Sequence, residues 1–267
     1  VSLIHLDVDA STVAANYRTD VPLVGDARLS LHALNEALSE HLRHHPRELA
    51  ANGLPIAEQA RARKWAAFAP LAASLDQPIK PERVVDALNR LLPANSILVA
   101  DPGTPCPYFS AYFHNSTVPG RHFITNRAHG ALGYAMSAGV GAWFGRPEST
   151  VVAVMGDGSF AFTCGELETI VRRQVPLKMI VFSNTVFGWI KASQKVGYQE
   201  RYFSVDFGRT EHAKVAEAFG VKSWRVQDPA QLDAAIKAAL AHPGPALIDV
   251  VSQQLQDAAT PVSQWMG

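Results

Sequence analysis

Apolar residues recur along the chain in two patterns that alternate with each other. Short runs rich in β-branched residues are typical of strands buried on both faces of a parallel sheet, and the clearest run spans 151–155. Longer stretches with apolar residues three or four positions apart are typical of helices with one buried face. The runs predict strands at 2–8, 22–26, 96–100, 151–155, 177–182, 224–226 and 246–250. The longer stretches predict helices at 10–15, 29–43, 56–75, 81–92, 166–173, 187–193, 206–219 and 232–240, and a Gly- and Ala-rich helix that ends at 145.

Strands that alternate with helices in this way predict an α/β fold, with a doubly wound, mostly parallel sheet and helices on both faces. Pro78 and Pro81 mark a boundary, because proline breaks regular structure and is tolerated in a helix only near its first turn. We therefore expect one domain at 77–252, a preceding segment at 1–76 and a polar, unpatterned C-terminal tail at 253–267.

The central βαβ stretch carries the candidate chemistry. Its first apolar strand ends in Gly-Asp-Gly-Ser at 156–159, and its second ends at Asn184. Ligands of such units bind beyond the carboxyl ends of the strands, and Gly156 and Gly158 would let the backbone approach a phosphate. The oxygens of Asp157 and Asn184 are hard ligands suited to a Mg²⁺ ion that also holds phosphate. The alternative is that Asp157 only caps a turn.

Composition and charge narrow the class of protein. Of the 267 residues, 24 are Lys or Arg and 24 are Asp or Glu, so no net field favours nucleic acid or an anionic membrane. No apolar run reaches the length that spans a bilayer, which predicts no membrane partner. Cys106 and Cys164 match no metal or redox spacing, and we expect small buried hydrophobes in a reducing, cytoplasmic compartment.

The Gly-Asp-Gly motif, with Asn184 after a further 25 residues, resembles the cofactor motif of thiamin-diphosphate (ThDP) enzymes in the acetolactate synthase/2-oxo-acid decarboxylase superfamily. That family often has two Asn residues at this point, whereas this chain has Ser183 before Asn184. The segment VPLVGDA at 21–27 also resembles the end of the family's central domain. The resemblance covers nearly the whole chain. It extends over the last part of the family's central domain and the whole of its diphosphate-binding domain.

The resemblance implies a Mg²⁺ ion and a ThDP cofactor at this site. The Mg²⁺ ligands would be the side chains of Asp157 and Asn184 and the main-chain carbonyl of Val186. In the synthases a Gly-Gln-His segment contacts the diphosphate of the cofactor. This chain has Gly-Thr-Pro at the corresponding positions, 103–105, so the location of the contact is kept but the side chains differ. The residues expected to contact the cofactor are Gly103, Thr104, Gly130, Leu132, Gly156, Asp157, Gly158, Ser159, Asn184, Val186, Phe187 and Gly188.

Four residues near the predicted pocket are candidates for a role in catalysis. Leu132 matches the bulky apolar residue that holds the cofactor in a bent, V-shaped pose in the family, and the Gly130 carbonyl would meet its aminopyrimidine edge. Arg127 and His129 replace a glycine and a leucine of the family pattern, and would hold a substrate carboxylate or shuttle a proton. Trp189 lies where the family shapes its substrate pocket. The alternatives are a core role for Leu132 and Trp189, and structural hydrogen bonds for Arg127 and His129.

As a whole, the resemblance implies a ThDP- and Mg²⁺-dependent decarboxylase or carboligase that acts on a 2-oxo acid or a related carbonyl substrate. The glutamate that activates the cofactor belongs to an N-terminal pyrimidine-binding domain, normally supplied by a neighbouring subunit, and we do not expect that domain within these residues. We therefore expect a fragment, or one subunit of a split enzyme, that is inactive alone and works in a homo- or hetero-oligomer. Whether the missing part of the central domain binds FAD stays open.

Two other classes of function also stay open. One is a non-catalytic ThDP-binding or regulatory subunit. The other is a different α/β nucleotide binder, such as a kinase or dehydrogenase domain, although the chain has neither a Walker lysine nor a G-x-G-x-x-G that opens a helix.

Overall fold

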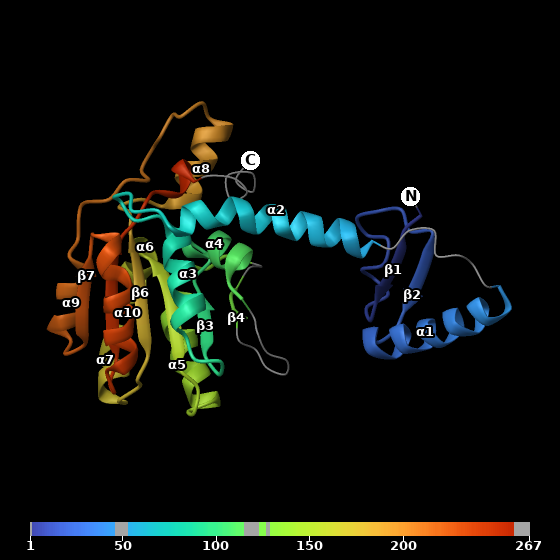
Figure 1. Ribbon diagram of the computed structural model, residues 1–267, viewed down its shortest axis with the longest axis horizontal. Helices are drawn as coiled ribbons and strands as arrows, with labels where there is room; N and C mark the ends of the chain where they lie inside the picture. The colour runs from blue at the N-terminus through green and yellow to red at the C-terminus, as the bar shows by residue number, and fades with distance from the viewer. Residues whose placement is uncertain (1, 46–52, 115–122, 127–128, 259–267) are drawn as a thin grey trace. The chain divides into compact units, whose positions relative to one another are not determined.

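The computed structural model describes residues 2–45, 53–114, 123–126 and 129–258. The chain forms two compact units, Val1–Ala60 and Arg61–Gly267, each with its own sheet (Figure 1). Among the described residues, no helix combines the length and the apolar character that crossing a membrane requires.

The first unit is a small α/β layer. Strands β1 (Ile4–Asp7) and β2 (Val21–Val24) pair in parallel, and helix α1 (Ala27–His44) follows them. The side chain of Asp26 accepts a hydrogen bond from the Leu29 amide at 3.0 Å, which satisfies one of the free donors at the start of α1.

The helix predicted at 10–15 is wrong, since turns occupy this stretch. The carboxylate of Asp9 accepts hydrogen bonds from the amide and the hydroxyl of Ser11, at 2.8 and 2.7 Å. Side-chain bonds of this kind offer the backbone an alternative to the helix. Ala14 then takes a positive φ of 64°, which no right-handed helix contains.

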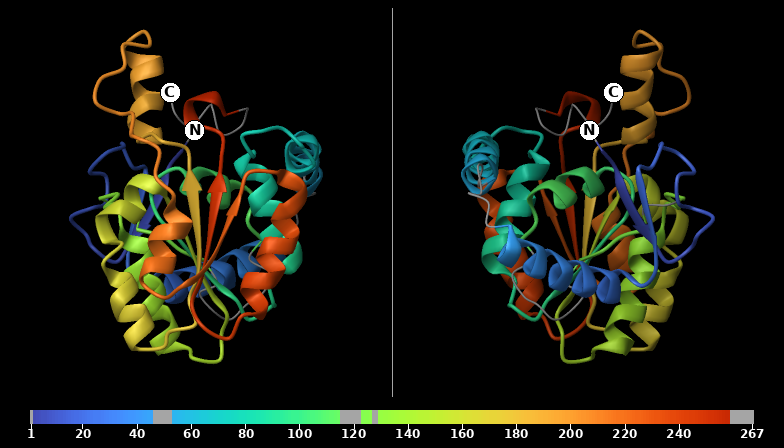
Figure 2. Two further views of the ribbon diagram at one scale, coloured as in Figure 1. Left: turned by 90° about the vertical axis from the view of Figure 1, so that its left-hand side faces the viewer. Right: turned by 90° about the vertical axis from the view of Figure 1, so that its right-hand side faces the viewer.

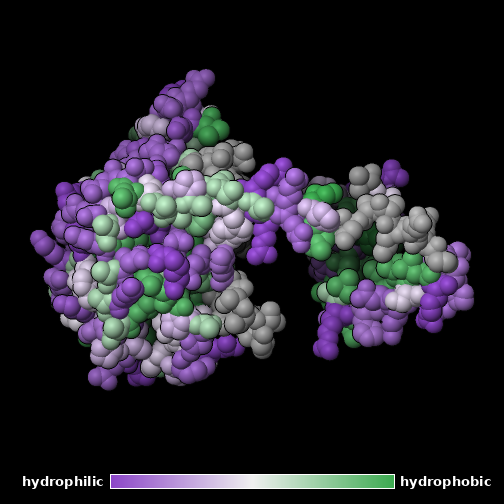
Figure 3. All heavy atoms as spheres, in the orientation of Figure 1, coloured by the Kyte–Doolittle hydropathy of each residue, from purple (hydrophilic) through white to green (hydrophobic). Residues whose placement is uncertain are grey.

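Helix α1 has no buried residue. Five leucines on it are more than a third exposed, and Figure 3 shows apolar atoms at the surface of this unit; they are Leu29, Leu31, Leu34, Leu38 and Leu42. In the described part of the unit, the apolar side of α1 is therefore left largely uncovered.

The second unit is built on a six-stranded sheet with the order β4-β3-β5-β6-β8-β7, and every pairing in it is parallel. The predicted α/β class and parallel sheet are confirmed. A two-residue strand, β4, was not predicted, because so short an element leaves no pattern. The strands are β3 (Ile97–Ala100), β4 (Phe123–Ile124), β5 (Val151–Gly156), β6 (Lys178–Ser183), β7 (Lys222–Val226) and β8 (Ala246–Val251).

Helices cover both faces of this sheet, as Figure 2 shows. On one face α3, α4 and α10 pack against strand residues such as Val152 and Ile180, and on the other α5, α7 and α9 pack against Ala153 and Met179. Neighbouring strand residues thus enter different cores, as the two-residue period of a strand requires. The helices that follow α1 in the chain are α2 (Leu54–Ala72), α3 (Pro81–Leu91), α4 (Pro105–Tyr112), α5 (Tyr134–Gly145), α6 (Asp157–Thr163), α7 (Glu166–Arg172), α8 (Gly188–Gly197), α9 (His212–Ala218) and α10 (Leu232–Ala241).

Two segments for which the sequence predicts no helix are helical. Helix α4 lies between the strand predicted at 96–100 and the Gly- and Ala-rich helix, with Pro105 at its first position. Nearly all of its residues are buried, so its sequence shows no helical period. Helix α6 begins at Asp157 itself, so Gly-Asp-Gly-Ser consists of the last residue of β5 followed by the first turn of a helix.

The two cysteines are free thiols. Cys106 is buried on α4, as predicted, whereas Cys164 is only partly buried after α6.

Candidate functional site

A cavity of about 50 Å³, open to solvent, lies beyond the carboxyl ends of β3, β5 and β6. Ligands bind at this edge of a parallel sheet, because the segments that follow the strands converge there. All residues expected to contact a cofactor line this cavity except Gly130 and Asn184, and Trp189 and Ile190 complete the wall. The lining residues are Gly103, Thr104, Leu132, Gly156, Asp157, Gly158, Ser159, Val186, Phe187, Gly188, Trp189 and Ile190.

Asp157 connects the ends of two neighbouring strands. Its Oδ2 accepts the backbone amides of Asn184 at 2.9 Å and Thr185 at 2.6 Å, and its Oδ1 accepts that of Gly158 at 2.8 Å. The residue is buried, and burial raises the pKa of its carboxyl group, although the amides of Thr185 and Gly158 act against this rise. Asp157 therefore does more than cap its own turn, since it also holds the chain beyond β6.

Asn184 is buried and bridges two further segments of the site. Its Nδ2 donates to Thr104 Oγ1 at 3.1 Å, and its main-chain carbonyl accepts Gln254 Nε2 at 2.9 Å. Its Oδ1 receives a long bond of 3.4 Å from the amide of Val186. The amide side chain is thus oriented by Thr104, while its oxygen is only weakly engaged.

The glycines that line the cavity differ in how closely their surroundings pack against them. A Cβ added to Gly158 would lie 2.8 Å from Phe187 Cε1, and one added to Gly188 would lie 2.7 Å from Thr104 Oγ1. A Cβ on Gly156 would meet no atom within 4 Å. The close packing within this chain therefore requires glycine at 158 and 188. At 156 no packing contact requires glycine, and the space beside it at the cavity wall is open.

Two of the four candidate catalytic residues line the cavity. Leu132 is partly buried, and a Cβ on Gly103 would lie 3.5 Å from its Cδ2. Trp189 is also partly buried, packs against the core and donates its Nε1–H to the Gly103 carbonyl at 3.2 Å. Trp189 therefore has both a packing role and a place in the cavity wall.

The segment before Leu132 is less informative. His129 and Gly130 are exposed and are not among the lining residues, and Gly130 has a φ of 68°, a conformation that favours glycine. Arg127 lies outside the described residues.

Asp101 organises the site and was not predicted as a site residue. It is fully buried at the end of β3, where Oδ2 accepts the amides of Gly133 and Ala135, both at 3.1 Å, and Oδ1 accepts the hydroxyl of Ser159 at 2.8 Å. Burial raises its pKa, and these bonds oppose the rise. An aspartate directly after a buried strand was the available signal, but its partners become visible only once the chain is folded.

The sequence that forms this cavity matches a known family. A family model described as the thiamine pyrophosphate enzyme, C-terminal TPP binding domain, matches residues 101–250. The chain belongs to this family. Thiamine pyrophosphate (TPP) is another name for ThDP, and the matched TPP-binding segment contains every residue of the cavity wall.

The TPP-enzyme relatives include acetolactate synthases. The chain is 30% identical over 255 residues to a probable acetolactate synthase large subunit of Methanococcus aeolicus, covering 92% of this chain and 42% of the relative. It is 28% identical over 240 residues to the acetolactate synthase isozyme 3 large subunit of Escherichia coli, covering 90% and 41%. It is 31% identical over 239 residues to an acetolactate synthase of Mycobacterium avium, covering 84% and 36%. The chain therefore spans about two fifths of the length of these relatives.

Proposed function

We propose that this chain is the diphosphate-binding part of a ThDP- and Mg²⁺-dependent decarboxylase or carboligase that acts on a 2-oxo acid or a related carbonyl compound. The observation that carries the proposal is that Asp157 and Asn184 follow adjacent strands and lie next to each other beside the cavity, where the Asn184 backbone amide donates to the Asp157 carboxylate at 2.9 Å. A carboxylate and an amide oxygen are both hard ligands of the kind that Mg²⁺ takes.

The residues at the cavity fit the group that the family implies. The open space above Gly156 gives a diphosphate room at the end of β5. Asp157, Asn184 and the main-chain carbonyl of Val186 would hold Mg²⁺, and the cation would offset the cost of burying the Asp157 carboxylate. The chemistry that ThDP supplies when bound is addition to a carbonyl and uptake of the electron pair that decarboxylation releases.

The remaining candidates receive roles in shaping the pocket. Leu132 would support the cofactor rings, and Trp189, fixed by its bond to the Gly103 carbonyl, would limit the size of the substrate and exclude water. Arg127 and His129, which precede Leu132 in the chain, would bind the substrate carboxylate or shuttle a proton.

The catalytic glutamate would come from outside this chain. Among the lining residues, all within the described part of the chain, Asp157 is the one carboxylate, and we assign it to the metal. A pyrimidine-binding domain or subunit would supply the activating acid in a homo- or hetero-oligomer. In this proposal residues 77–252 form the diphosphate-binding domain, 1–76 the end of the central domain with its linker, and 253–267 the tail.

Native mass spectrometry of the purified protein, followed by the denaturing mass of each component, tests this arrangement. We expect decarboxylation of pyruvate, as a simple 2-oxo acid, only from a complex or a longer chain that contains the pyrimidine-binding domain. Decarboxylation by the isolated 267-residue chain would overturn the proposal. Complexes that bind ThDP but turn over no 2-oxo acid would favour a regulatory subunit instead.

A further inference from the structure

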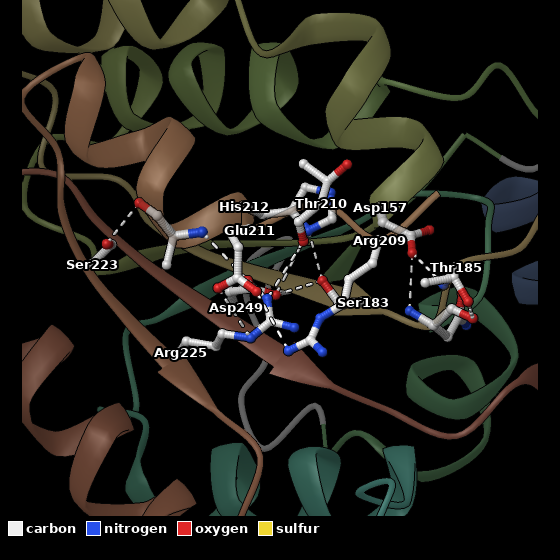
Figure 4. Close-up of polar contacts among 12 residues, drawn as sticks. Asp157, Ser183, Thr185, Arg209, Thr210, Glu211, His212, Ser223, Arg225 and Asp249 are labelled. Atoms are coloured by element: carbon white, nitrogen blue, oxygen red, sulfur yellow. Dashed lines mark hydrogen bonds and ion pairs between the residues drawn. The ribbon is translucent and has the colours of Figure 1, made fainter. Parts of the chain in front are cut away.

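A buried polar cluster lies at the same end of β6 as Asn184 and joins four elements (Figure 4). The hydroxyl of Ser183, the last residue of β6, donates to Asp249 of β8 and lies 2.7 Å from Nδ1 of His212, the first residue of α9. Asp249 also pairs with the Arg225 guanidinium of β7. Ser183 and His212 are 6% exposed and Asp249 is fully buried, so water cannot easily replace these bonds.

The direction of each hydrogen bond follows from the protons available. A serine hydroxyl has one proton, and here Asp249 accepts it, so the hydroxyl oxygen must accept the Nδ1–H of His212. Burial alone would raise the pKa of Asp249, but His212, whose Nδ1 lies 3.7 Å from the carboxylate, the bond from Ser183 and the charge of Arg225 hold this pKa below its ordinary value. The result is a directed chain, from imidazole to hydroxyl to carboxylate, in which each orientation fixes the next.

This chain of hydrogen bonds is attached directly to the candidate metal site. The carbonyl of Ser183 accepts the amide of Ser252 at 3.1 Å, and the next amide, that of Asn184, donates to Asp157 at 2.9 Å. The peptide that joins Ser183 to Asn184 is therefore held by Ser252, just beyond β8, and by Asp157, the first residue of α6. A shift of the Ser183 side chain would move the amide that orients the Asp157 carboxylate.

We propose that Ser183, His212 and Asp249 are positioning residues that fix Asp157 and Asn184 in the geometry that binds Mg²⁺. The proposal rests on the function proposed above, and it assigns a role to the serine that stands where the resembling family often has a second asparagine. Substitution of a group that hydrogen-bonds to a metal ligand and orients it commonly weakens metal binding about 10- to 100-fold.

Hydrogen exchange on the full chain without cofactor tests the positioning directly. We expect Ser183→Ala to speed exchange of the Asn184 and Thr185 amides about 10-fold, the size expected when one buried hydrogen bond is lost. The matched control is Ser223→Ala, which removes another buried hydroxyl that holds α9, at 2.8 Å from the Ala213 carbonyl, without touching Ser183 (Figure 4). This control should lower stability but leave the two amides protected.

The His212 contact is tested by a pair of amide substitutions. His212→Asn places a donor near the position of Nδ1, whereas His212→Gln places it near Nε2. Mg²⁺ affinity is measured by titrating the ion into the chain with ThDP and following tryptophan fluorescence, to which Trp189 contributes from the cavity wall. We expect about 10- to 100-fold weaker Mg²⁺ binding in Ser183→Ala and His212→Gln, and near wild-type binding in His212→Asn and Ser223→Ala.

The two proposals fail in different ways. A wild-type chain that binds no Mg²⁺ with ThDP overturns the proposed function, and the exchange comparison then decides the positioning role by itself. The positioning role is overturned if Ser183→Ala and Ser223→Ala give the same exchange of Asn184 and Thr185, or if His212→Gln binds Mg²⁺ as tightly as His212→Asn.

Discussion

The carboxylate of Asp157, at the end of β5, accepts the backbone amide of Thr185, just beyond β6, at 2.6 Å (Figure 4). Thr185 has a φ of 60°, a conformation that few side chains other than Asn or Gly adopt at low cost. The bond to Asp157 stabilises this turn, and the turn places Asn184 beside Thr104 and Val186 at the cavity. A strained backbone position is therefore held by the residue that we assign to the metal.

Substitution of Gly156 should separate cofactor binding from stability. The Cβ of Gly156→Ala meets no protein atom within 4 Å, so we expect a free energy of unfolding within about 0.5 kcal/mol of the wild type. The same methyl group occupies the room that a diphosphate needs, so ThDP binding should be lost. Urea unfolding and calorimetric titration with ThDP and Mg²⁺ measure the two effects.

Gly158→Ala provides the contrasting variant. Its Cβ would lie 2.8 Å from Phe187 Cε1 and 3.1 Å from Phe207, so the variant should lose about 1–3 kcal/mol of stability through overpacking. Equal stability losses in the two glycine variants would contradict the packing described here.

Asp101 should be far more important for stability than the serine that it binds. Asp101→Ala leaves two buried amides and the Ser159 hydroxyl without an acceptor, each costing about 1–3 kcal/mol. Ser159→Ala removes one hydrogen bond and should cost about 1 kcal/mol. Urea midpoints measure both, and an Asp101→Ala chain as stable as Ser159→Ala would show that Asp101 does not organise the site.

Burial of Lys178, at the start of β6, should make the free energy of unfolding rise with pH. Burial lowers its pKa to about 8, while its ammonium donates to the carbonyls of His242 and Gly244. Above that pH the native chain binds fewer protons than the unfolded chain, so the free energy of unfolding should rise between about pH 8 and 10. Urea unfolding at about pH 7.5, just below this range, and at about pH 9.5, near its upper end, measures the rise.

Two variants of the sheet isolate this effect. Lys178→Met should lack the rise, while Lys222→Met should keep it, since Lys222 pairs with the same residue, Ala246, but is exposed. A Lys178→Met chain with the wild-type slope would assign the pH dependence to other groups.

The leucines of α1 should be replaceable without loss of stability. Leu34 and Leu38 are 45% and 51% exposed, so changing both to Gln should alter the free energy of unfolding by less than about 1 kcal/mol. The change should also reduce binding of a hydrophobic dye, because it removes exposed apolar surface. Leu88→Ala in α3, where Leu88 is 1% exposed, is the control and should cost about 2–5 kcal/mol. A large loss from the α1 pair would mean that this side of the helix is packed.

The sheet of the second unit was predictable because its strands are buried on both faces. The runs at 151–155 and 177–182 are uniformly apolar, and the structure contains both as β5 and β6. The nearness of Asp157 and Asn184 followed from the same pattern, since parallel neighbouring strands end at one edge.

Other features depend on contacts that no local pattern contains. Helix α4 is buried nearly all round and so shows no period, and the turns at 10–15 depend on the Asp9 side chain. The role of Asp101 requires Gly133 to fold back against the end of β3, and that of Ser183 requires α9 to bring His212 beside it. Such long-range polar pairings are invisible until the chain is folded.

The central claim is that Asp157 and Asn184 bind a Mg²⁺ ion that holds ThDP, and calorimetric titration of ThDP into the chain, with and without Mg²⁺, tests it most directly. We predict binding that requires Mg²⁺ and is lost in Asp157→Ala and Asn184→Ala, but kept in Asp228→Ala, which removes an aspartate that caps a turn after β7. ThDP binding that is unchanged without Mg²⁺, or unchanged in the Asp157 and Asn184 variants, would contradict the claim.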